Sequence, residues 1–261
     1  MPWVDVLGND LYYVEAGTGQ PLVFLHGMSS CGEAWFQQFE RFGNRYRCIA
    51  YDSINHGHSA NSPRDADEPD RADELEGFLA ALGIERPILA GNSMGAGTLL
   101  RWAARHPGKA LALIPSGMGV AVDAATAGLP QLRPLDHETL FLPIGDSLTE
   151  GFKAKNPRMY ERYLRIRSTA TRIEALRHLR KPSERSLAER RSLAERVPAI
   201  TSPMLIVVGS LDRVMPMCER LHALVPHSEY LSIEGAPHNV YYEAAAQYND
   251  AVEAFLNKVA R

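Results

Sequence analysis

Short, continuously apolar runs alternate with stretches of helical periodicity along most of the 261 residues. Strands that are apolar at consecutive positions are typical of a mostly parallel sheet that helices cover on both faces. We therefore expect an α/β fold. The predicted strands are 21–25, 47–52, 87–90, 110–114, 204–208 and 229–233, preceded by an antiparallel strand over 11–15, and the predicted helices are 71–82, 94–105, 218–224 and 243–259.

Composition excludes several other classes of protein. The chain is 45% hydrophobic and 23% charged, with a formal net charge of −3, which does not fit a disordered chain, a collagen-like repeat or a strongly basic nucleic-acid module. Its three cysteines are too few and too scattered for a disulfide framework or a cysteine zinc site. The first residues lack a secretory signal, and no stretch has the roughly 18 apolar residues of a membrane span. We therefore expect a cytoplasmic protein with no cofactor and no metal, which binds neither nucleic acid nor membrane.

The alternation stops between about residues 120 and 199. Residues 153–196 hold 14 Lys and Arg against five Glu and no Asp, a net charge of +9 that leaves −12 for the rest of the chain. The hexapeptide at 185–190 is repeated immediately, which is too short for a solenoid and indicates a single exposed helix. Because so long a loop is uncommon in a compact domain, we predict a helical cap over 120–199, inserted into a core made of 1–119 and 200–261.

Ser93 stands in the pattern Gly91-Asn-Ser-Met-Gly95, directly between a predicted strand and a predicted helix. A serine on such a turn is forced into a sharp, strained bend that lifts its hydroxyl above the sheet, and the two glycines leave room for the bend. The N-terminus of the following helix stabilises negative charge developing at the same place. The pattern alone often arises by chance, with a glycine-rich turn as its simplest interpretation. Its position between strand and helix favours a nucleophile.

His238 is the strongest candidate for the base among nine histidines, because it follows the last predicted strand in a loop that opens the final helix. His56 and His58 form an H-x-H pair, for which a polar turn is a simpler interpretation than a metal site because no third ligand is evident. His26 ends the first parallel strand, and we expect it to hold the loop geometry by hydrogen bonding.

Two carboxylates are candidates for the acid that orients the histidine. Asp212 lies just past the fifth predicted parallel strand, and the chain order Ser93, Asp212, His238 is the one expected of this elbow architecture. Asp123 lies beyond the fourth, where some sheets of this kind keep their acid. We favour Asp212 because its loop comes directly off a strand end. Its alternative role is the N-cap of a helix ahead of Met217.

These motifs, taken together, resemble those of the α/β-hydrolase fold. They span the chain from about 11 to 259 apart from the inserted segment, and are His26-Gly27-Met28, Gly91-Asn-Ser-Met-Gly95, Gly209-Ser-Leu-Asp212 with Pro216, and Gly235-Ala-Pro-His238. The resemblance implies an α/β-hydrolase core with a helical cap. It also implies an oxyanion hole made by the backbone N–H groups of Met28 and Met94.

A serine nucleophile argues against the members of this fold that use an aspartate, notably haloalkane dehalogenases and epoxide hydrolases. A serine with this base and oxyanion hole serves acyl transfer to water, so we expect a serine hydrolase acting on a small-molecule ester, thioester or lactone. Two alternatives stay open. The Asn-Ser-Met trio also resembles that of hydrolases cleaving carbon–carbon bonds in ring-fission products, and the same fold can serve as a non-catalytic ligand receptor.

The basic cap has two interpretations. Its arginines either attract an anionic substrate or form a solvated face paired with glutamates four residues away, as Arg185 and Glu189 allow. We favour the second for most of them. The expected partner is a small molecule, anionic under the first interpretation, and homo-oligomerisation stays open. The residues that we expect to line the substrate site are His26, Gly27, Asn92, Phe141, Tyr163 and Val240.

Overall fold

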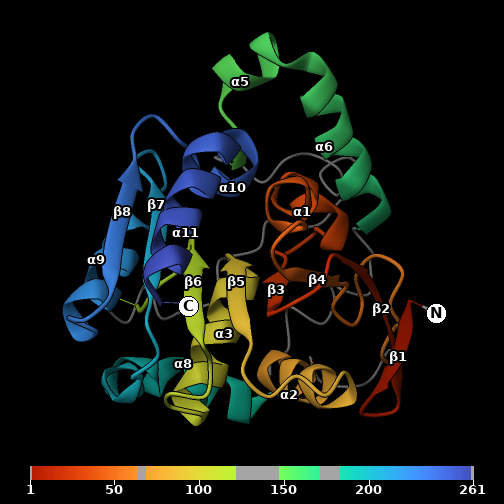
Figure 1. Ribbon diagram of the computed structural model, residues 1–261, viewed down its shortest axis with the longest axis vertical. Coiled ribbons are helices and arrows are strands. Elements are labelled where there is room, and N and C mark those ends of the chain that lie inside the picture. Colours follow the sequence, from red (N-terminus) through yellow and green to blue (C-terminus); the bar gives the residue numbers. More distant parts are fainter. Residues whose placement is uncertain (1, 64–68, 122–146, 171–182, 260–261) are drawn as a thin grey trace.

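The computed structural model describes residues 2–63, 69–121, 147–170 and 183–259. The described strands form one sheet in the order β1-β2-β4-β3-β5-β6-β7-β8 (Figure 1). Strands three to eight run parallel, and the first two pair antiparallel at one edge. The strands are β1 Trp3–Val6, β2 Asn9–Ala16, β3 Pro21–Leu25, β4 Arg47–Tyr51, β5 Ile88–Asn92, β6 Ala112–Ser116, β7 Leu205–Gly209 and β8 Glu229–Ile233.

Helices cover both faces of this sheet. The described helices are η1 Gly32–Trp35, α1 Phe36–Phe42, α2 Arg71–Ala81, α3 Met94–Arg105, α5 Glu150–Lys155, α6 Pro157–Ala170, α8 Glu184–Arg196, η3 Val197–Ala199, α9 Met215–Leu224, α10 Val240–Glu243 and α11 Ala245–Val259. One face carries α2, α3, α8 and α9. The other carries η1, α1, α10 and α11, with part of α6 packed against them. The arrangement is the layered α/β fold that the sequence predicts.

Two apolar cores form because side chains of consecutive strand residues point to opposite faces. Leu89 of β5 lies in the core beneath α3, whereas its neighbours Ile88 and Ala90 lie in the core beneath α11. Trp102 is fully buried in the first core, and Trp35 is fully buried in the second. Burial on both faces is what makes these strands apolar at consecutive positions.

Each predicted parallel strand overlaps an observed one, so the prediction of the sheet is confirmed. The sequence patterns do not predict β1, whose burial is confined mainly to Val6 at its end, nor the short η1–α1 segment. The final helix begins earlier than predicted, at Val240, and is interrupted at Ala244 between α10 and α11.

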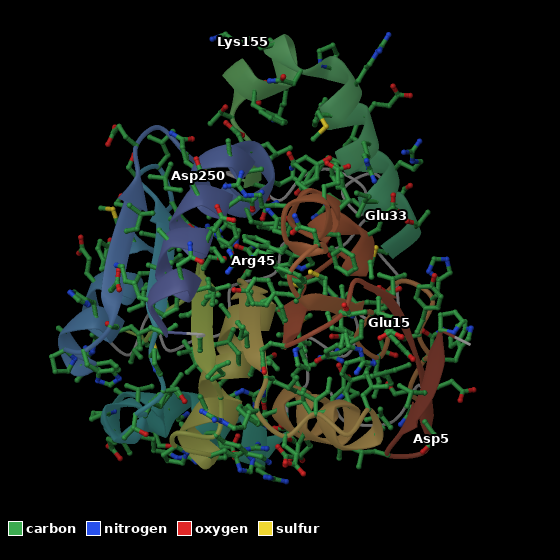
Figure 2. The ribbon with its side chains drawn as sticks, viewed as in Figure 1. Asp5, Glu15, Glu33, Arg45, Lys155 and Asp250 are labelled. Atoms are coloured by element: carbon green, nitrogen blue, oxygen red, sulfur yellow. The ribbon has the colours of Figure 1, made fainter. Side chains whose placement is uncertain are left out.

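The described parts of the predicted insertion lie at opposite ends of the molecule (Figure 1). α5 and α6 lie beyond the carboxyl ends of the parallel strands, where α6 contacts η1. The Arg162 guanidinium lies 3.4 Å from the centroid of the Phe36 ring and 3.8 Å from the carboxylate of Glu33. Figure 2 labels Glu33 beside α6, and Lys155 at the outer end of α5.

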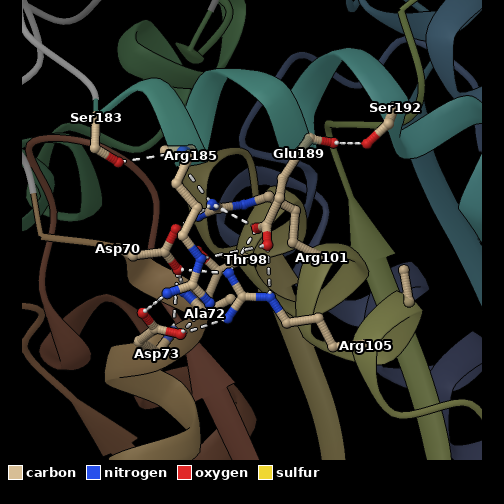
Figure 3. A network of polar contacts seen from close by, with 12 residues as sticks. Asp70, Ala72, Asp73, Thr98, Arg101, Arg105, Ser183, Arg185, Glu189 and Ser192 are labelled. Carbon is tan, nitrogen blue, oxygen red and sulfur yellow. Dashed lines mark hydrogen bonds and ion pairs between the residues drawn. The ribbon is translucent and has the colours of Figure 1, made fainter.

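α8 packs against α3 at the other end of the sheet, and it is held there by ion pairs (Figure 3). Arg105 of α3 lies 2.6 Å from Glu189 of α8, and Arg185 of α8 lies 2.9 Å from Asp73 of α2. The repeated hexapeptide forms a single helix, as predicted, and Arg185 lies 3.9 Å from Glu189 one turn away. The helix is not exposed all round, since Ser186 and Leu193 are buried against the core.

Within the part of the chain that the structure describes, no helix combines the length and the apolar character that crossing a membrane requires.

Candidate active site

Ser93 occupies a strained turn between β5 and α3. Its backbone has φ +52° and ψ −111°, a region that costs a non-glycine residue about 1–3 kcal/mol. The turn needs close approaches on both sides. A Cβ on Gly91 would lie 2.6 Å from the carbonyl carbon of Gly95, and a Cβ on Gly95 would lie 2.2 Å from the carbonyl oxygen of Leu25. Both glycines are therefore required, and the serine adopts the elbow geometry that the sequence predicts.

His238 and Asp212 form a direct pair. His238 Nδ1 lies 2.8 Å from Asp212 Oδ2, and the carboxylate is buried while the imidazole is half-buried. The other oxygen, Oδ1, accepts the N–H of Val214 at 3.1 Å, so the acid is fixed in place. Because Nδ1 donates to a carboxylate, a neutral imidazole presents Nε2 as an acceptor.

Of the two acid candidates, the structure brings Asp212 to the histidine. Asp123 lies outside the described residues. The alternative role of Asp212 as a helix N-cap is wrong, because α9 has Val214 as its N-cap residue and no side-chain cap. The aspartate instead closes a tight turn after β7 and faces the loop after β8.

The loops that carry the serine and the histidine meet at Gly117, just past β6. A Cβ at this position would lie 3.1 Å from Asn92 Oδ1 and 3.2 Å from His238 Cε1. A Cβ on Gly27, in the loop after β3, would lie 3.5 Å from the Cβ of Ser93.

The strand order places these loops together. β3 lies between β4 and β5 in the sheet, so the chain leaves β3 toward one neighbour and later returns to the other. Such a switch in strand order opens a crevice at the carboxyl ends of the strands, and these loops converge there.

The resemblance assigns the oxyanion hole to the N–H groups of Met94 and Met28. Met94 is the first residue of α3, and the first N–H groups of a helix have no intrahelical acceptor. Met28 follows Gly27, where an added Cβ would contact the serine turn. Both methionines are half-buried. A helix N-terminus beside a second backbone N–H is suited to an oxygen that gains negative charge.

His26 holds the loop after β3, which confirms its predicted role. Its Nδ1 lies 2.7 Å from the carbonyl oxygen of Gly27, and its Nε2 accepts the N–H of Ser53 at 2.9 Å. Burial lowers the pKa of His26, although Asp52 opposes this shift. The imidazole is thus neutral with its proton on Nδ1, and both nitrogens are used by the main chain.

The H-x-H pair lies in the loop after β4, where hydrogen bonds hold it. His56 Nδ1 lies 3.1 Å from the carbonyl oxygen of Ile54, and the N–H of His58 donates to buried Asp52 at 2.9 Å. Among the described residues, no three His, Cys, Asp or Glu side chains are grouped as metal ligands.

The remaining predicted site residues divide into three cases. Asn92 and Tyr163 are buried and both hydrogen-bond to Asn239, from Asn92 Nδ2 to Oδ1 at 3.1 Å and from Asn239 Nδ2 to the Tyr163 hydroxyl at 2.8 Å. Val240 is fully buried in the core on the α11 side of the sheet. Phe141 lies outside the described residues. Asn239 has no signal in the sequence beyond its place next to His238, because its partners are 76 and 147 residues away.

Comparisons with known proteins identify the family and the fold of the chain. The sequence profile of the Alpha/beta hydrolase family matches residues 22–251. A relative from Mesorhizobium japonicum, 2-(acetamidomethylene)succinate hydrolase, is 27% identical over 91% of this chain and 88% of its own length. Non-heme chloroperoxidase CPO-A1 from Kitasatospora aureofaciens is 37% identical, but over only 38% of this chain and 36% of its own length.

Among solved structures, a thermophilic esterase from Thermogutta terrifontis superposes with a TM-score of 0.80 over 98% of both chains, at 22% identity. That likeness concerns the fold, and the family profile extends over most of the sheet and the three loops that carry the candidate catalytic residues. The chain belongs to the Alpha/beta hydrolase family.

Proposed function

We propose that the protein is a serine hydrolase that cleaves a carboxylic ester, thioester or lactone of a small molecule. Ser93 is the nucleophile, His238 the general base and Asp212 the acid that orients it. The observation that carries the proposal is the 2.8 Å contact between His238 Nδ1 and the buried Asp212 carboxylate. The loop of His238 meets the strained Ser93 turn at Gly117.

In the proposed reaction, His238 takes the hydroxyl proton of Ser93 while the serine oxygen attacks the carbonyl carbon. The buried carboxylate of Asp212 stabilises the imidazolium that forms. The N–H groups of Met94 and Met28 donate to the oxyanion of the tetrahedral intermediate. When the intermediate collapses, the alcohol leaves with the proton from His238, and the acyl group stays on Ser93.

Water completes the cycle. His238, again neutral, removes a proton from water as the water oxygen attacks the acyl carbonyl carbon, and the same N–H groups hold the second oxyanion. Collapse of that intermediate releases the carboxylic acid and returns the proton to Ser93. Each proposed step uses one of the side chains or main-chain N–H groups named above, and none of these steps calls for a cofactor.

We further propose that α5 and α6 belong to a cap over the site. Thr149, at the start of α5, donates its N–H to Glu243 of α10 at 2.7 Å. The carbonyl oxygen of Ala170, at the end of α6, accepts the N–H of Gly57 at 3.2 Å. The helix pair therefore connects α10 with the loop after β4 at the carboxyl edge of the sheet. Of the predicted cap over 120–199, this proposal retains α5 and α6, and it assigns α8 to the core.

The substrate class is tested by assaying the full chain with matched p-nitrophenyl ester, thioester, lactone and ring-fission dienoate substrates. We expect turnover of at least one acyl substrate that is lost in Ser93→Ala. Ser202→Ala is the matched control, because it removes a buried hydroxyl that donates to the carbonyl oxygen of Ala110 at the opposite edge of the sheet. Preference for the dienoate would favour carbon–carbon cleavage. Binding without turnover of any of them would favour a receptor.

A further inference from the structure

A chain of buried polar side chains joins the two catalytic loops to α6. Ser116 Oγ lies 3.3 Å from Asn92 Oδ1, Asn92 Nδ2 donates to Asn239 Oδ1 at 3.1 Å, and Asn239 Nδ2 donates to the Tyr163 hydroxyl at 2.8 Å. These residues are between 0% and 8% exposed. Buried polar groups are costly unless they are hydrogen-bonded, so each member depends on its neighbours for a stable position.

Each end of the central bond lies next to a proposed catalytic residue. Asn92 immediately precedes Ser93, and Asn239 immediately follows His238. The Asn92–Asn239 bond therefore ties the nucleophile turn directly to the histidine loop. Since oxygen and nitrogen of Asn239 are both engaged, rotation of its side chain would break two bonds at once.

Tyr163 extends this connection to α6. Its hydroxyl is the acceptor for Asn239 Nδ2, and the N–H of Asn239 donates to the carbonyl oxygen of Ser147, ahead of α5, at 3.1 Å. Asn239 is thus bound through its side chain to α6 and through its main chain to the segment leading into α5. The position of the histidine loop depends on both.

We propose that Asn239, held by Tyr163, is a positioning residue that sets His238 against Ser93 and couples this placement to the seating of α6. The inference rests on the proposed function, since it assigns a role within the same site. A displacement of about 1 Å in a catalytic group can cost on the order of 100-fold in rate. A bond that fixes the residue next to the base therefore acts on turnover more than on substrate binding.

A second tyrosine provides a matched control. Tyr242 of α10 donates its hydroxyl to the carbonyl oxygen of Met159 in α6 at 2.8 Å. Its ring packs against Tyr163 with centroids 5.2 Å apart. Tyr242→Phe and Tyr163→Phe therefore remove the same group from the same interface between α6 and the core. Only the second removes the acceptor of Asn239.

The experiment measures the rate at which a fluorophosphonate probe labels Ser93, together with kcat and KM for a p-nitrophenyl ester. The full chain is compared with Tyr163→Phe, Tyr242→Phe, Asn239→Ala and the Tyr163→Phe/Asn239→Ala double variant.

We expect Tyr163→Phe to lower both the labelling rate and kcat about tenfold, with KM within about twofold. Tyr242→Phe should leave both rates within about twofold. We expect the two tyrosine variants to have similar melting temperatures, so that a difference in rate does not reflect a difference in stability. The double variant should label no more slowly than Asn239→Ala, because both changes break one chain.

Equal rates in the two tyrosine variants, or losses that multiply in the double variant, would overturn the positioning role. Tyr163→Phe keeps the ring that packs in the core, so the comparison holds even where Asn239→Ala does not fold. If the unaltered chain labels no faster than Ser93→Ala, the proposed function fails and the positioning role fails with it. If the chain labels at Ser93 but the tyrosine variants behave alike, the positioning role alone fails.

Discussion

α6 and α8 come from the same basic segment, yet different interactions hold them in different places. α6 lies at the catalytic end, where Tyr163 and Met159 hydrogen-bond to residues beside or within α10. α8 lies against the far part of α3, where its charged side chains pair with those of α2 and α3. One helix is bonded to the loop of the proposed catalytic histidine, and the other is bonded to helices of the core.

The position of α8 shows that the net charge of a segment does not predict whether its charged side chains attract substrate or pair with other parts of the fold. Arg101 and Arg105, which form ion pairs with α8, come eight and twelve residues after Ser93 in α3, about 12–18 Å along a helix. Part of the negative charge of the core is neutralised by these ion pairs, because Asp70 and Asp73 contact arginines of α3 and α8. An arginine so paired is poorly placed to attract substrate.

The largest expected effect is at the catalytic end. Asp212→Asn keeps the shape of the side chain but disturbs the tautomer of His238, so we expect kcat to fall about 10⁴-fold with a small change in melting temperature. Asp123→Asn is the control and should cost far less. The measurement is steady-state kinetics beside thermal unfolding, and a reversed order of the two costs would place the acid after β6.

At the α8 end the expected effect is on stability. Asp70 accepts the N–H groups of Ala72 and Asp73, a role that asparagine retains, and it lies 3.0 Å from buried Arg101. Asp70→Asn leaves that cation without its nearest carboxylate, so we expect the free energy of unfolding to fall by about 2–3 kcal/mol with kcat unchanged. Denaturant unfolding and ester hydrolysis of one preparation check both. A loss of kcat without a loss of stability would contradict the division between the two ends.

The same substitution has an expected pH dependence. Burial raises the pKa of Asp70, but Arg101, the Asp73 N–H and Arg105 outweigh it, so the pKa lies below its ordinary value of 3.8. A lowered pKa stabilises the folded state fully above the unfolded value, and this contribution disappears as pH falls through the folded value. The stability difference between the parent and Asp70→Asn should be constant near neutral pH and shrink below about pH 4. A stability difference that grows as the pH falls would mean that folding raises the pKa of Asp70 instead of lowering it.

The smallest effect is expected for Arg185, whose guanidinium pairs with Asp73. Arg185→Gln should change kcat/KM for an anionic ester by less than about 1.5-fold relative to a matched neutral ester, at salt concentrations from about 0.01 to 1 M, because the charge of Arg185 is already paired with that of Asp73. A loss of kcat/KM that is confined to the anionic ester and depends on salt would mean that α8 does attract an anionic substrate.

The sequence predicts the sheet well because the signals of its strands are local, and the candidate catalytic residues are proposed from signals of the same local kind. Each buried strand is a continuous apolar run, and Ser93 and His238 each follow such a run within a short motif. Asp212 is predictable for the same reason, since its loop leaves β7 directly. β1 escapes prediction because its residues are mostly exposed and carry no apolar run.

The place of α8 and the role of Asn239 depend instead on contacts between distant parts of the chain. Glu189 reaches an arginine 84 residues earlier, and nothing in the hexapeptide repeat specifies that partner. Asn239 is an ordinary polar residue in a loop until the fold brings Asn92 and Tyr163 to its side chain. Long-range pairing of this kind follows from packing, which local patterns do not encode.

The central claim is that Ser93 carries the acyl group during turnover. It is tested most directly by mixing the chain with a p-nitrophenyl ester, quenching in acid, and mapping the acylated peptide by mass spectrometry. The account predicts a burst of about one p-nitrophenol per chain and an acyl group on Ser93, with both absent from Ser93→Ala. An acyl group on another residue, or hydrolysis by Ser93→Ala within about tenfold of the parent, would contradict it.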